Sequence, residues 1–490
     1  MKRIICLVLI FIFLASFPVS AKSELVLENL EAPIVEQLKE NTDQIVGRSI
    51  WDMTIYEGKL YIGWGDYDKN LGTMLDGLSL LCYTNETNTW NKVATIHDEE
   101  IARFYEYKGK LYIPGTDPIS RMGSVYEGDK FGLWSTIPTF SGGIHVFDIL
   151  FKDDIMYACY GQANGAKAVV RYSSDFCHYT DIDLMYDGKP VPVERGFARC
   201  YNLFEFDDNV YATLKVYGSS SNCDGLYKLD KDKMVMNYVG EAPSNLILNS
   251  FRTEFKGNLV YGRSVVEFTK TPEDINSWKT LPDYEGTVTC LKEFDGALYF
   301  TAYTEKDGKY VSKLYKTKDL KTTEVVYTLE YDSYVRSFTY DNGVFYIGTG
   351  CKSTAKSESA GTVFSLCEKQ YDKTNISVTA NIKSDEKNAM PKWVNYQIKA
   401  GNKVVYEGTL TAKNDWNFSL ENVDARDDWK VVVTEDSVGY KWKAKLNNGV
   451  FELTNNTSDY TVLYIVFGIL GAVLIFGGII LMIFKAKKKK

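Results

Sequence analysis

A repeated ten-residue phrase limits the folds open to this chain more than any other feature. The stretch "EGKLYIGWGD" occupies residues 57–66, and "KGKLYIPGTD" occupies residues 108–117. Looser copies continue to residue 350, and each is an apolar, aromatic-rich run beside a turn signal, which is typical of a β-strand. The seven central tyrosines, spaced 38 to 54 residues apart, are Tyr61, Tyr112, Tyr157, Tyr211, Tyr261, Tyr299 and Tyr346.

A second phrase follows each copy and combines a short strand pattern, a polar turn and often a tryptophan, as in residues 80–93. Repeats of this length made only of short strands are typical of β-propellers, where a ring of sheets lets each blade cover its neighbours. The sequence therefore predicts an all-β fold with a seven-bladed β-propeller at residues 22–372. The last copy is one strand short, and "SELVLENL" at residues 23–30 is expected to supply that strand and close the ring.

Two of the polar turns resemble the Asp-box turn of bacterial Asp-box or Kelch-like propellers, including sialidases. Ser173 with Asp175, and Thr317 with Asp319, match the hydroxyl and the aspartate of that turn, whereas its glycine and tryptophan are missing. The resemblance implies a propeller head whose turns brace the blades. It carries no catalytic residue over to this chain.

Residues 375–457 have a different pattern, in which alternating strands with Gly and Asn turns predict a small β-sandwich. The segment also resembles a prealbumin-like, Cna B-type repeat, the stalk module of Gram-positive surface proteins. The matching stretches are "VT" at 378–379, Pro391, "NDWNFSLENV" at 414–423, "VTEDSVGY" at 433–440 and "FELTN" at 451–455. The resemblance implies that this segment is a stalk.

Many members of the Cna B-type family form an internal Lys–Asn isopeptide bond with the help of an acid. The resemblance places Asn455 and Glu435 at the amide and acid positions. Ala380 stands where the lysine is expected, and Lys383 lies three residues further on, which would place its side chain on the other face. No isopeptide bond is therefore expected.

Both ends of the chain have the pattern of membrane-targeting segments. Residues 1–21 have a basic start, an apolar run and a small-residue site, as in a secretory signal peptide. Residues 461–484 contain no charged residue and are long enough for a transmembrane helix. The tail at 485–490, "KAKKKK", predicts that this end is cytoplasmic. The expected location is thus the cell membrane, single-pass, with the N-terminal ectodomain outside.

The charge and the cysteines describe the exported part. The chain has a net charge of −8, and the part without the basic ends carries about −15, which argues against nucleic acid as a partner. Eight of the nine cysteines lie beyond the signal segment, an even number that suits disulfides, for example between Cys351 and Cys367. Free buried thiols are the alternative.

No motif for a zinc site, a nucleotide-binding loop or a nucleophile elbow is present, so neither a cofactor nor a catalytic residue is predicted. Asp66, Asp68 and Asn70 alternate as at the start of a calcium loop. Leu71 separates them from the glycine at position 72, where the usual pattern has no such residue. A calcium site and a solvated hairpin turn both remain open for this stretch.

Cationic residues recur where the innermost strand of each blade is expected to begin. Innermost strands line a propeller's axis, so such residues would form a ring at one mouth, and guanidinium groups bind carboxylate, sulfate or phosphate. The predicted ligand-binding residues are Arg103, Arg199, Arg252, Arg336, His145 and Trp51. The alternative is that the arginines tie neighbouring blades through buried acids such as Glu106, Glu205 and Glu254.

Taken together, these features predict an adhesin-like, membrane-anchored binding protein whose propeller head recognises a glycan or another surface ligand, an anionic one included. Two other function classes remain open. One is a membrane-tethered glycan hydrolase or lyase on the same propeller, and a sialidase-like enzyme would need an acid–nucleophile pair that the sequence does not reveal. The other is a platform for protein assembly.

Overall fold

The computed structural model describes residues 25–456 apart from short gaps. The gaps are residues 32–33, 35–37, 39–41, 67–70, 72–74, 86, 119–121, 142, 163–167, 192–196, 219–220, 369–372, 383–389, 402, 425–427 and 448–449. Contacts divide the described chain into two compact units, residues 25–368 and the residues from 369 onward. We call them the propeller unit and the sandwich unit.

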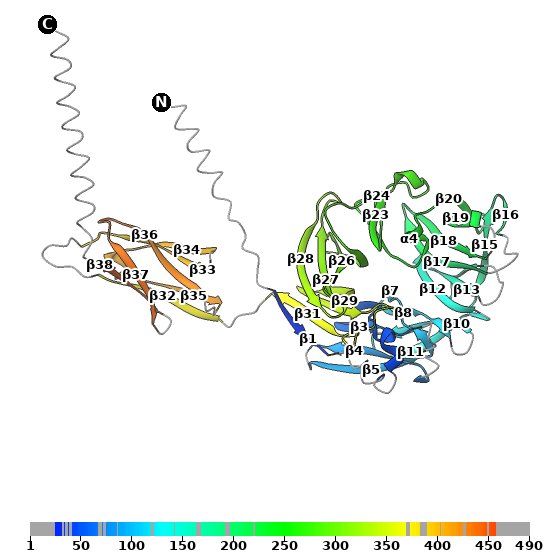
Figure 1. Ribbon diagram of the computed structural model, residues 1–490, viewed down its shortest axis with the longest axis horizontal. Coiled ribbons are helices and arrows are strands. Elements are labelled where there is room, and N and C mark those ends of the chain that lie inside the picture. Colours follow the sequence, from blue (N-terminus) through cyan, green and yellow to red (C-terminus); the bar gives the residue numbers. More distant parts are fainter. Residues whose placement is uncertain are drawn as a thin grey trace, which may run out of the picture. The chain divides into compact units, whose positions relative to one another are not determined.

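The propeller unit contains seven four-stranded antiparallel arrangements, here called blades 1 to 7, and they lie in a ring (Figure 1). Blades 1 to 4 are β2 (Asp52–Tyr56), β3 (Lys59–Gly63), β4 (Leu78–Thr84) and β5 (Thr89–Ile96); β7 (Tyr105–Tyr107), β8 (Lys110–Pro114), β10 (Met122–Asp129) and β11 (Trp134–Ser141); β12 (Gly143–Lys152), β13 (Ile155–Gln162), β14 (Val169–Ser173) and β15 (Thr180–Tyr186); and β17 (Phe197–Phe206), β18 (Asn209–Tyr217), β19 (Gly225–Asp230) and β20 (Val235–Gly240).

The remaining blades follow the same order. Blades 5 to 7 are β21 (Phe251–Phe255), β22 (Asn258–Arg263), β23 (Val265–Thr269) and β24 (Lys279–Thr280); β25 (Thr287–Phe294), β26 (Ala297–Lys306), β27 (Lys309–Thr317) and β28 (Glu324–Tyr331); and β29 (Tyr334–Asp341), β30 (Val344–Gly350) and β31 (Val363–Glu368) with β1 (Leu25–Asn29). Short elements between them are η1 (Thr42–Arg48), β6 (Asp98–Glu100), β9 (Thr116–Pro118), β16 (Lys189–Pro190), η3 (Ser221–Cys223), α4 (Ser244–Ile247) and η4 (Ile275–Ser277).

The repeated sequence phrase is the hairpin between the first and second strands of each blade. All seven predicted tyrosines lie in the second strand. The two turn residues before that strand have positive φ, as at Glu57 (49°) with Gly58 (70°) and at Asp207 (48°) with Asp208 (61°). A two-residue hairpin turn of this type needs positive φ at both positions, which favours Gly, Asn and Asp. The phrase recurs because each blade uses the same turn.

The ring closes through the N-terminal strand, as the sequence predicted. Strand β1 pairs antiparallel with β31, from Leu25 opposite Glu368 to Asn29 opposite Phe364. Blade 7 also contacts blade 1 directly, because the Ile50 N–H donates to the carbonyl of Thr349 at 3.0 Å. The first and last parts of the unit therefore complete one closed, propeller-like ring.

Blades 3 and 4 are joined into one larger sheet. Strand β13 pairs with β17 where Gly161 lies opposite Arg199, and β15 pairs in parallel with β20. The short strands β6 and β9 extend this sheet at β12. Buried hydrophobic side chains fill the spaces between neighbouring blades, as between blades 1 and 2, where Trp64 is fully buried.

The sandwich unit has two sheets. One contains β35 (Asn417–Asp424), β32 (Lys373–Asn381), β38 (Val450–Asn456) and β37 (Lys441–Asn447); the other contains β34 (Lys403–Leu410), β33 (Val394–Ala400) and β36 (Trp429–Asp436), with η5 at Ala412–Asn414. Their facing residues form one core, in which Val378, Tyr396 and Leu453 are almost fully buried. The predicted all-β character thus extends to this unit.

The isopeptide positions lie in this unit. Ala380 is buried on β32 and is paired with Leu453 of β38, whereas Glu435 is exposed on β36. Asn455 is buried, and Lys383 lies outside the described residues. The buried acid of β36 is instead Asp436, which accepts hydrogen bonds from the N–H of Val438 (2.6 Å) and from the indole N–H of Trp442 (2.7 Å).

The predicted signal segment at 1–21, the predicted span at 461–484 and the tail at 485–490 lie outside the described residues. In the part of the chain that is described, no helix combines the length and the apolar character that crossing a membrane requires. The eight described cysteines are all free thiols. The suggested disulfide between Cys351 and Cys367 is therefore absent, and seven of the eight thiols are at least partly buried.

Candidate functional site

Two cavities lie on the axis of the propeller unit. The first, of about 430 Å³, is lined by residues of blades 3 to 7 and by the segments that lead into blades 1 and 2, and we call it the arginine pocket. Its charged and aromatic lining residues are Trp51, Glu100, Arg103, Phe147, Tyr201, Phe251, Arg263, Tyr303, Tyr334 and Arg336. The second, of about 560 Å³, we call the glutamate pocket, and its carboxylate residues are Asp52, Glu106, Glu205 and Glu293. The two cavities share Arg103, Ser250 and Phe251.

The innermost strands explain why the cavities differ. Residues at the start of these strands, such as Trp51, Arg103 and Arg336, line the arginine pocket. Residues near their ends, such as Glu106 and Glu293, line the glutamate pocket. Because equivalent positions of a ring meet at the same depth on the axis, a residue type that recurs in several blades gathers at one mouth.

Two of the predicted arginines are held on aromatic rings in the arginine pocket. The Arg336 guanidinium carbon lies 4.0 Å from the centre of the Trp51 ring, and that ring is fixed by the hydrogen bond from its N–H to the carbonyl of Gly65 (2.8 Å). The Arg103 guanidinium carbon lies 3.6 Å from the centre of the Phe251 ring. Within the described residues, neither guanidinium forms an ion pair with a carboxylate.

Arg263 is a third cation of this pocket, and sequence reasoning missed it. Its guanidinium donates to the carbonyl of Asn249 at 2.8 Å. Arg263 ends the second strand of blade 5, whereas the predicted ligand-binding residues lie where first strands begin. The signal that could have found it is the second-strand phrase "NLVYGR", whose last residue reaches the same end of the blade.

Stacked tyrosines form another wall of the arginine pocket. The rings of Tyr303 and Tyr334 stack with their centres 4.4 Å apart and their planes at 19°. The ammonium group of Lys352 lies 5.4 Å from the Tyr303 ring centre and 3.1 Å from a carboxylate oxygen of Glu305. The pocket therefore combines flat aromatic faces with cationic groups, and Glu100 is its one carboxylate among the described lining residues.

Arg199 and His145 lie apart from the other predicted residues and do not line the arginine pocket in the described part of the chain. Arg199 packs over Phe147 and Phe197, with its guanidinium carbon 5.6 Å and 4.8 Å from the two ring centres. His145 is buried and stacks on Phe147 at 4.9 Å. Burial, and then the nearby charge of Arg199, lower the pKa of His145 to about 3, so this imidazole is neutral near pH 7.

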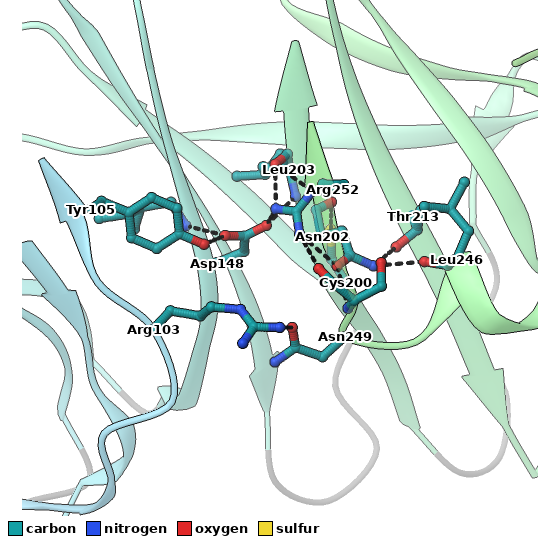
Figure 2. Close-up of polar contacts among 12 residues, drawn as sticks. Arg103, Tyr105, Asp148, Cys200, Asn202, Leu203, Thr213, Leu246, Asn249 and Arg252 are labelled. Atoms are coloured by element: carbon teal, nitrogen blue, oxygen red, sulfur yellow. Dashed lines mark hydrogen bonds and ion pairs between the residues drawn. The ribbon is translucent and has the colours of Figure 1, made fainter. Parts of the chain in front are cut away.

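Arg252 is buried inside a network that joins blades 2 to 5 (Figure 2). It forms an ion pair with Asp148, and it donates to the carbonyl of Leu203 (2.6 Å) and to the side-chain oxygen of Asn202 (2.9 Å). Asp148 also accepts hydrogen bonds from the Tyr105 hydroxyl and from the Leu203 N–H (2.7 Å). Burial lowers the pKa of Arg252 to about 10, which still leaves it charged near pH 7.

The arginines are therefore not held by the glutamates that the alternative interpretation named. Glu106, Glu205 and Glu254 are exposed, and Glu205 forms an ion pair with Lys152 at 2.6 Å. The acids that join blades are Asp148 and Asp52; Asp52 accepts from the Phe104 N–H of blade 2 at 3.0 Å. The glutamates face solvent because they lie one residue before the end of a first strand, beside the hairpin turn.

The polar side chains that connect one blade to the next share a position in the sequence repeat. Asp52, Asp148, Asn202 and Ser337 each stand nine residues before the central tyrosine of their blade. Each bonds to the backbone of the next blade, as Ser337 does by donating to the carbonyl of Ile50 at 2.7 Å. A short polar side chain at this point thus connects one blade to the next.

Of the three predicted calcium ligands, only Asp66 lies within the described residues. Asp66 is buried, while Asp68 and Asn70 lie outside the described residues. Across the described ranges, no group of three or more His, Cys, Asp or Glu side chains is arranged to hold a metal ion. The two Asp-box-like aspartates close turns: Asp175 accepts from the N–H of His178 (2.8 Å), and Asp319 from that of Lys321 (2.9 Å).

No model of a known protein family matches the chain, and no curated protein matches it. Similar solved structures include a mitotic checkpoint complex chain (9% identity, TM-score 0.42), over 71% of this chain and 96% of that one. YCF48 bound to a D1 peptide has 12% identity and a TM-score of 0.41, over 72% of this chain and all of that one. The computationally designed Ika8 protein has 12% identity and a TM-score of 0.37, over 65% of this chain and 96% of that one.

Proposed function

We propose that the propeller unit is a binding head that takes an anionic ligand with a flat apolar face, such as an acidic glycan, in the arginine pocket. The observation that carries this proposal is the pair of stacked guanidinium groups, Arg336 on Trp51 and Arg103 on Phe251, in one cavity. Neither has a carboxylate partner within the described residues. A ligand anion would supply that partner.

The aromatic supports strengthen this proposal. A guanidinium held on a ring keeps its N–H edge pointing sideways, and it is already partly stripped of water, so less freedom and less hydration are lost when an anion binds. The ring of Tyr303, which is partly exposed and stacks on the buried Tyr334, adds apolar surface to the pocket for the ring of a sugar. Anion and ring recognition thus occur in one pocket.

Binding fits the pocket better than glycan hydrolysis does. Most glycoside hydrolases place two carboxyl groups on either side of the bond that they cleave. Glu100 is the one carboxylate among the described lining residues of the arginine pocket. The proposal is therefore recognition without turnover.

We further propose that this head is displayed on the outer side of a membrane. The support is the sequence alone: the secretory pattern at 1–21 and the uncharged stretch at 461–484 with its lysine tail. In this arrangement the sandwich unit would be the stalk, in line with its Cna B-type resemblance. A cell-surface ligand is then the expected partner.

The test is to measure binding of the purified full chain to three immobilised polymers: polygalacturonate, dextran sulfate and neutral dextran. The chain is expected to bind at least one of the two anionic polymers and not to bind neutral dextran. Arg336→Ala and Arg103→Ala should each weaken that binding roughly ten-fold or more, because each removes a charge-assisted contact. Arg336→Lys should restore part of it, since it keeps the charge but not the fork.

Lys321→Ala is the matched control, since it removes one exposed positive charge from the turn after β27, away from the pocket. This variant should bind within about two-fold of the original chain, because one exposed and screened charge contributes little. Equal retention of dextran, or unchanged affinity in folded Arg336→Ala and Arg103→Ala variants, would show that the arginine pocket is not the site.

A further inference from the structure

Ser250 has an unusual position at the bottom of the arginine pocket. It is 1% exposed, it lines both axial cavities, and its hydroxyl has no hydrogen-bond partner among the described residues. Its backbone is fixed from both sides, because its N–H donates to Asn202 (3.2 Å) and its carbonyl accepts from Arg252 (2.8 Å). A buried polar group without a partner is costly for the protein alone, so a ligand atom is an apt partner.

Two further donors lie beside this hydroxyl. Arg103 donates to the side-chain oxygen of Asn249 at 3.2 Å, as Figure 2 shows. This bond orients the Asn249 amide, and its NH₂ group has no partner among the described residues. The carbonyl of Asn249 accepts from Arg263 at 2.8 Å, which holds the loop in place. Guanidinium, amide and hydroxyl therefore come together at the floor of the pocket.

Arg103 is held in place and still has N–H groups to offer an anion. Phe251 covers one face of its guanidinium at 3.6 Å, and the carbonyl of Ala102 accepts from one of its terminal nitrogens at 3.3 Å. With the bond to Asn249, two of the five guanidinium N–H groups are used and three remain for an anion. A carboxylate on a sugar ring can accept from two of them at once, through parallel hydrogen bonds.

We infer that Arg103, Asn249 and Ser250 form a specificity subsite for a carboxylate on a sugar ring that also carries free hydroxyls, as in hexuronate sugars. The carboxylate binds the edge of Arg103, and the sugar hydroxyl bonds to Ser250 and to the Asn249 amide. This inference rests on the proposed function, since it names the ligand class for the same pocket. It adds that the anion is recognised together with a hydroxyl of the same sugar ring.

The test compares oligogalacturonate, its neutral methyl ester and dextran sulfate as ligands of the full chain. The chain is expected to bind oligogalacturonate and to lose at least ten-fold in affinity for the methyl ester. Ser250→Ala should weaken oligogalacturonate binding about five- to ten-fold. Its thermal midpoint should stay the same or rise, because the substitution removes a buried hydroxyl that has no partner among the described residues.

Ser333→Ala is the matched control. Ser333 is also fully buried and stands one residue before a first strand, but its hydroxyl already shares a hydrogen bond with Ser359 at 2.8 Å. This variant should lose stability and keep its affinity. The opposite pattern, a destabilised Ser250→Ala variant with unchanged affinity, would assign Ser250 a purely structural role.

The outcomes separate the two proposals. Tight binding of dextran sulfate with no binding of oligogalacturonate would overturn the uronate subsite and leave the anion-binding function standing. Equal binding of the methyl ester and the free acid would also overturn the subsite, without the need for any variant. Failure to bind any of the anionic ligands would overturn both.

Discussion

Arg252 and Arg336 have the same side chain in opposite electrostatic surroundings. Arg252 is buried against Asp148, and removing either partner would leave a lone buried charge, which typically costs about 3–5 kcal/mol. Arg336 lies partly exposed on Trp51, within a cavity. The first is therefore suited to hold blades together, and the second to meet a ligand. We would not expect Arg252 to contact the ligand.

The lowered pKa of His145 predicts that the protein loses stability in mild acid. Its pKa is lowered to about 3 in the folded protein, by burial and by Arg199, against 6.5 for an unperturbed histidine. A base with a depressed pKa contributes stability that is present above pH 6.5 and is lost as the pH falls toward 3. His145→Asn should therefore reduce the drop in unfolding free energy between pH 6.5 and 5 by about 1–2 kcal/mol. Denaturant unfolding at several pH values measures this.

The raised pKa of Asp117 has the opposite effect on how stability changes with pH, so this residue provides an internal control. Burial, and then Glu99, raise its pKa to about 6, so its contribution is fully present below pH 3.8 and is lost as the pH rises through 6. Asp117→Asn should therefore steepen the loss of stability on acidification. The exposed His97 provides a second comparison, His97→Asn. Identical pH profiles for the original chain and His145→Asn would contradict the assignment.

At the scale of the element, the hairpins and the joins between blades differ in how well the sequence predicts them. The hairpin turns are local, since two residues with positive φ determine them, and they were found as a repeated phrase. The joins are not local: Asp148 meets Arg252, which lies 104 residues later along the chain. Sequence spacing could place Arg252 near the axis, but it could not show which acid it meets. For this reason the alternative prediction, in which glutamates such as Glu254 hold the arginines, is wrong for Arg252, whose partner is Asp148.

Asn202 is the side chain that connects blade 4 to the floor of the pocket. It donates to the carbonyl of Leu246 (2.8 Å) and of Leu248 (2.9 Å), and it accepts from the Ser250 N–H and from Arg252. Asn202→Ala leaves several buried groups unpaired and should lower the free energy of unfolding by roughly 3–5 kcal/mol. It should also weaken ligand binding, since it releases Ser250 and, with it, the floor.

Asn209→Ala is the matched control for this experiment. Asn209 lies in the same blade, but its amide bonds only to the exposed hairpin, at the carbonyl of Asp207 (2.7 Å). Its loss should cost less than about 1 kcal/mol. Denaturant unfolding compares the two variants directly. Equal effects of both substitutions would mean that the Asn202 network contributes no more than one exposed hydrogen bond.

At the scale of the whole molecule, the repeat count predicted the architecture because each blade is built by the same local rule, and a ring is the arrangement that covers every blade. The site was harder to predict. The pocket receives single residues from seven separate repeats, and their depth on the axis depends on shifts of one or two residues in each first strand. The sequence predicts all six residues at one mouth, whereas the structure brings only Trp51, Arg103 and Arg336 of them into the arginine pocket. It places Arg199 and His145 on Phe147, pairs Arg252 with Asp148, and adds Arg263, which was not predicted.

Closure by β1 predicts that a few residues at the start of the described chain stabilise the whole ring. Leu25 and Leu27 pack against the core between blades 6 and 7, and β1 is the outermost strand of blade 7. Replacing both with Asp should lower the unfolding free energy of the propeller unit by about 2–4 kcal/mol, because two partly buried leucines are lost and the end of a strand is released. Glu28→Lys, at an exposed position of the same strand, should change it by less than about 0.5 kcal/mol. Thermal and denaturant unfolding, followed by the fluorescence of the propeller tryptophans, measures the difference. If the double variant keeps the original midpoint while a protease removes its N-terminal strand, the ring does not depend on this closure.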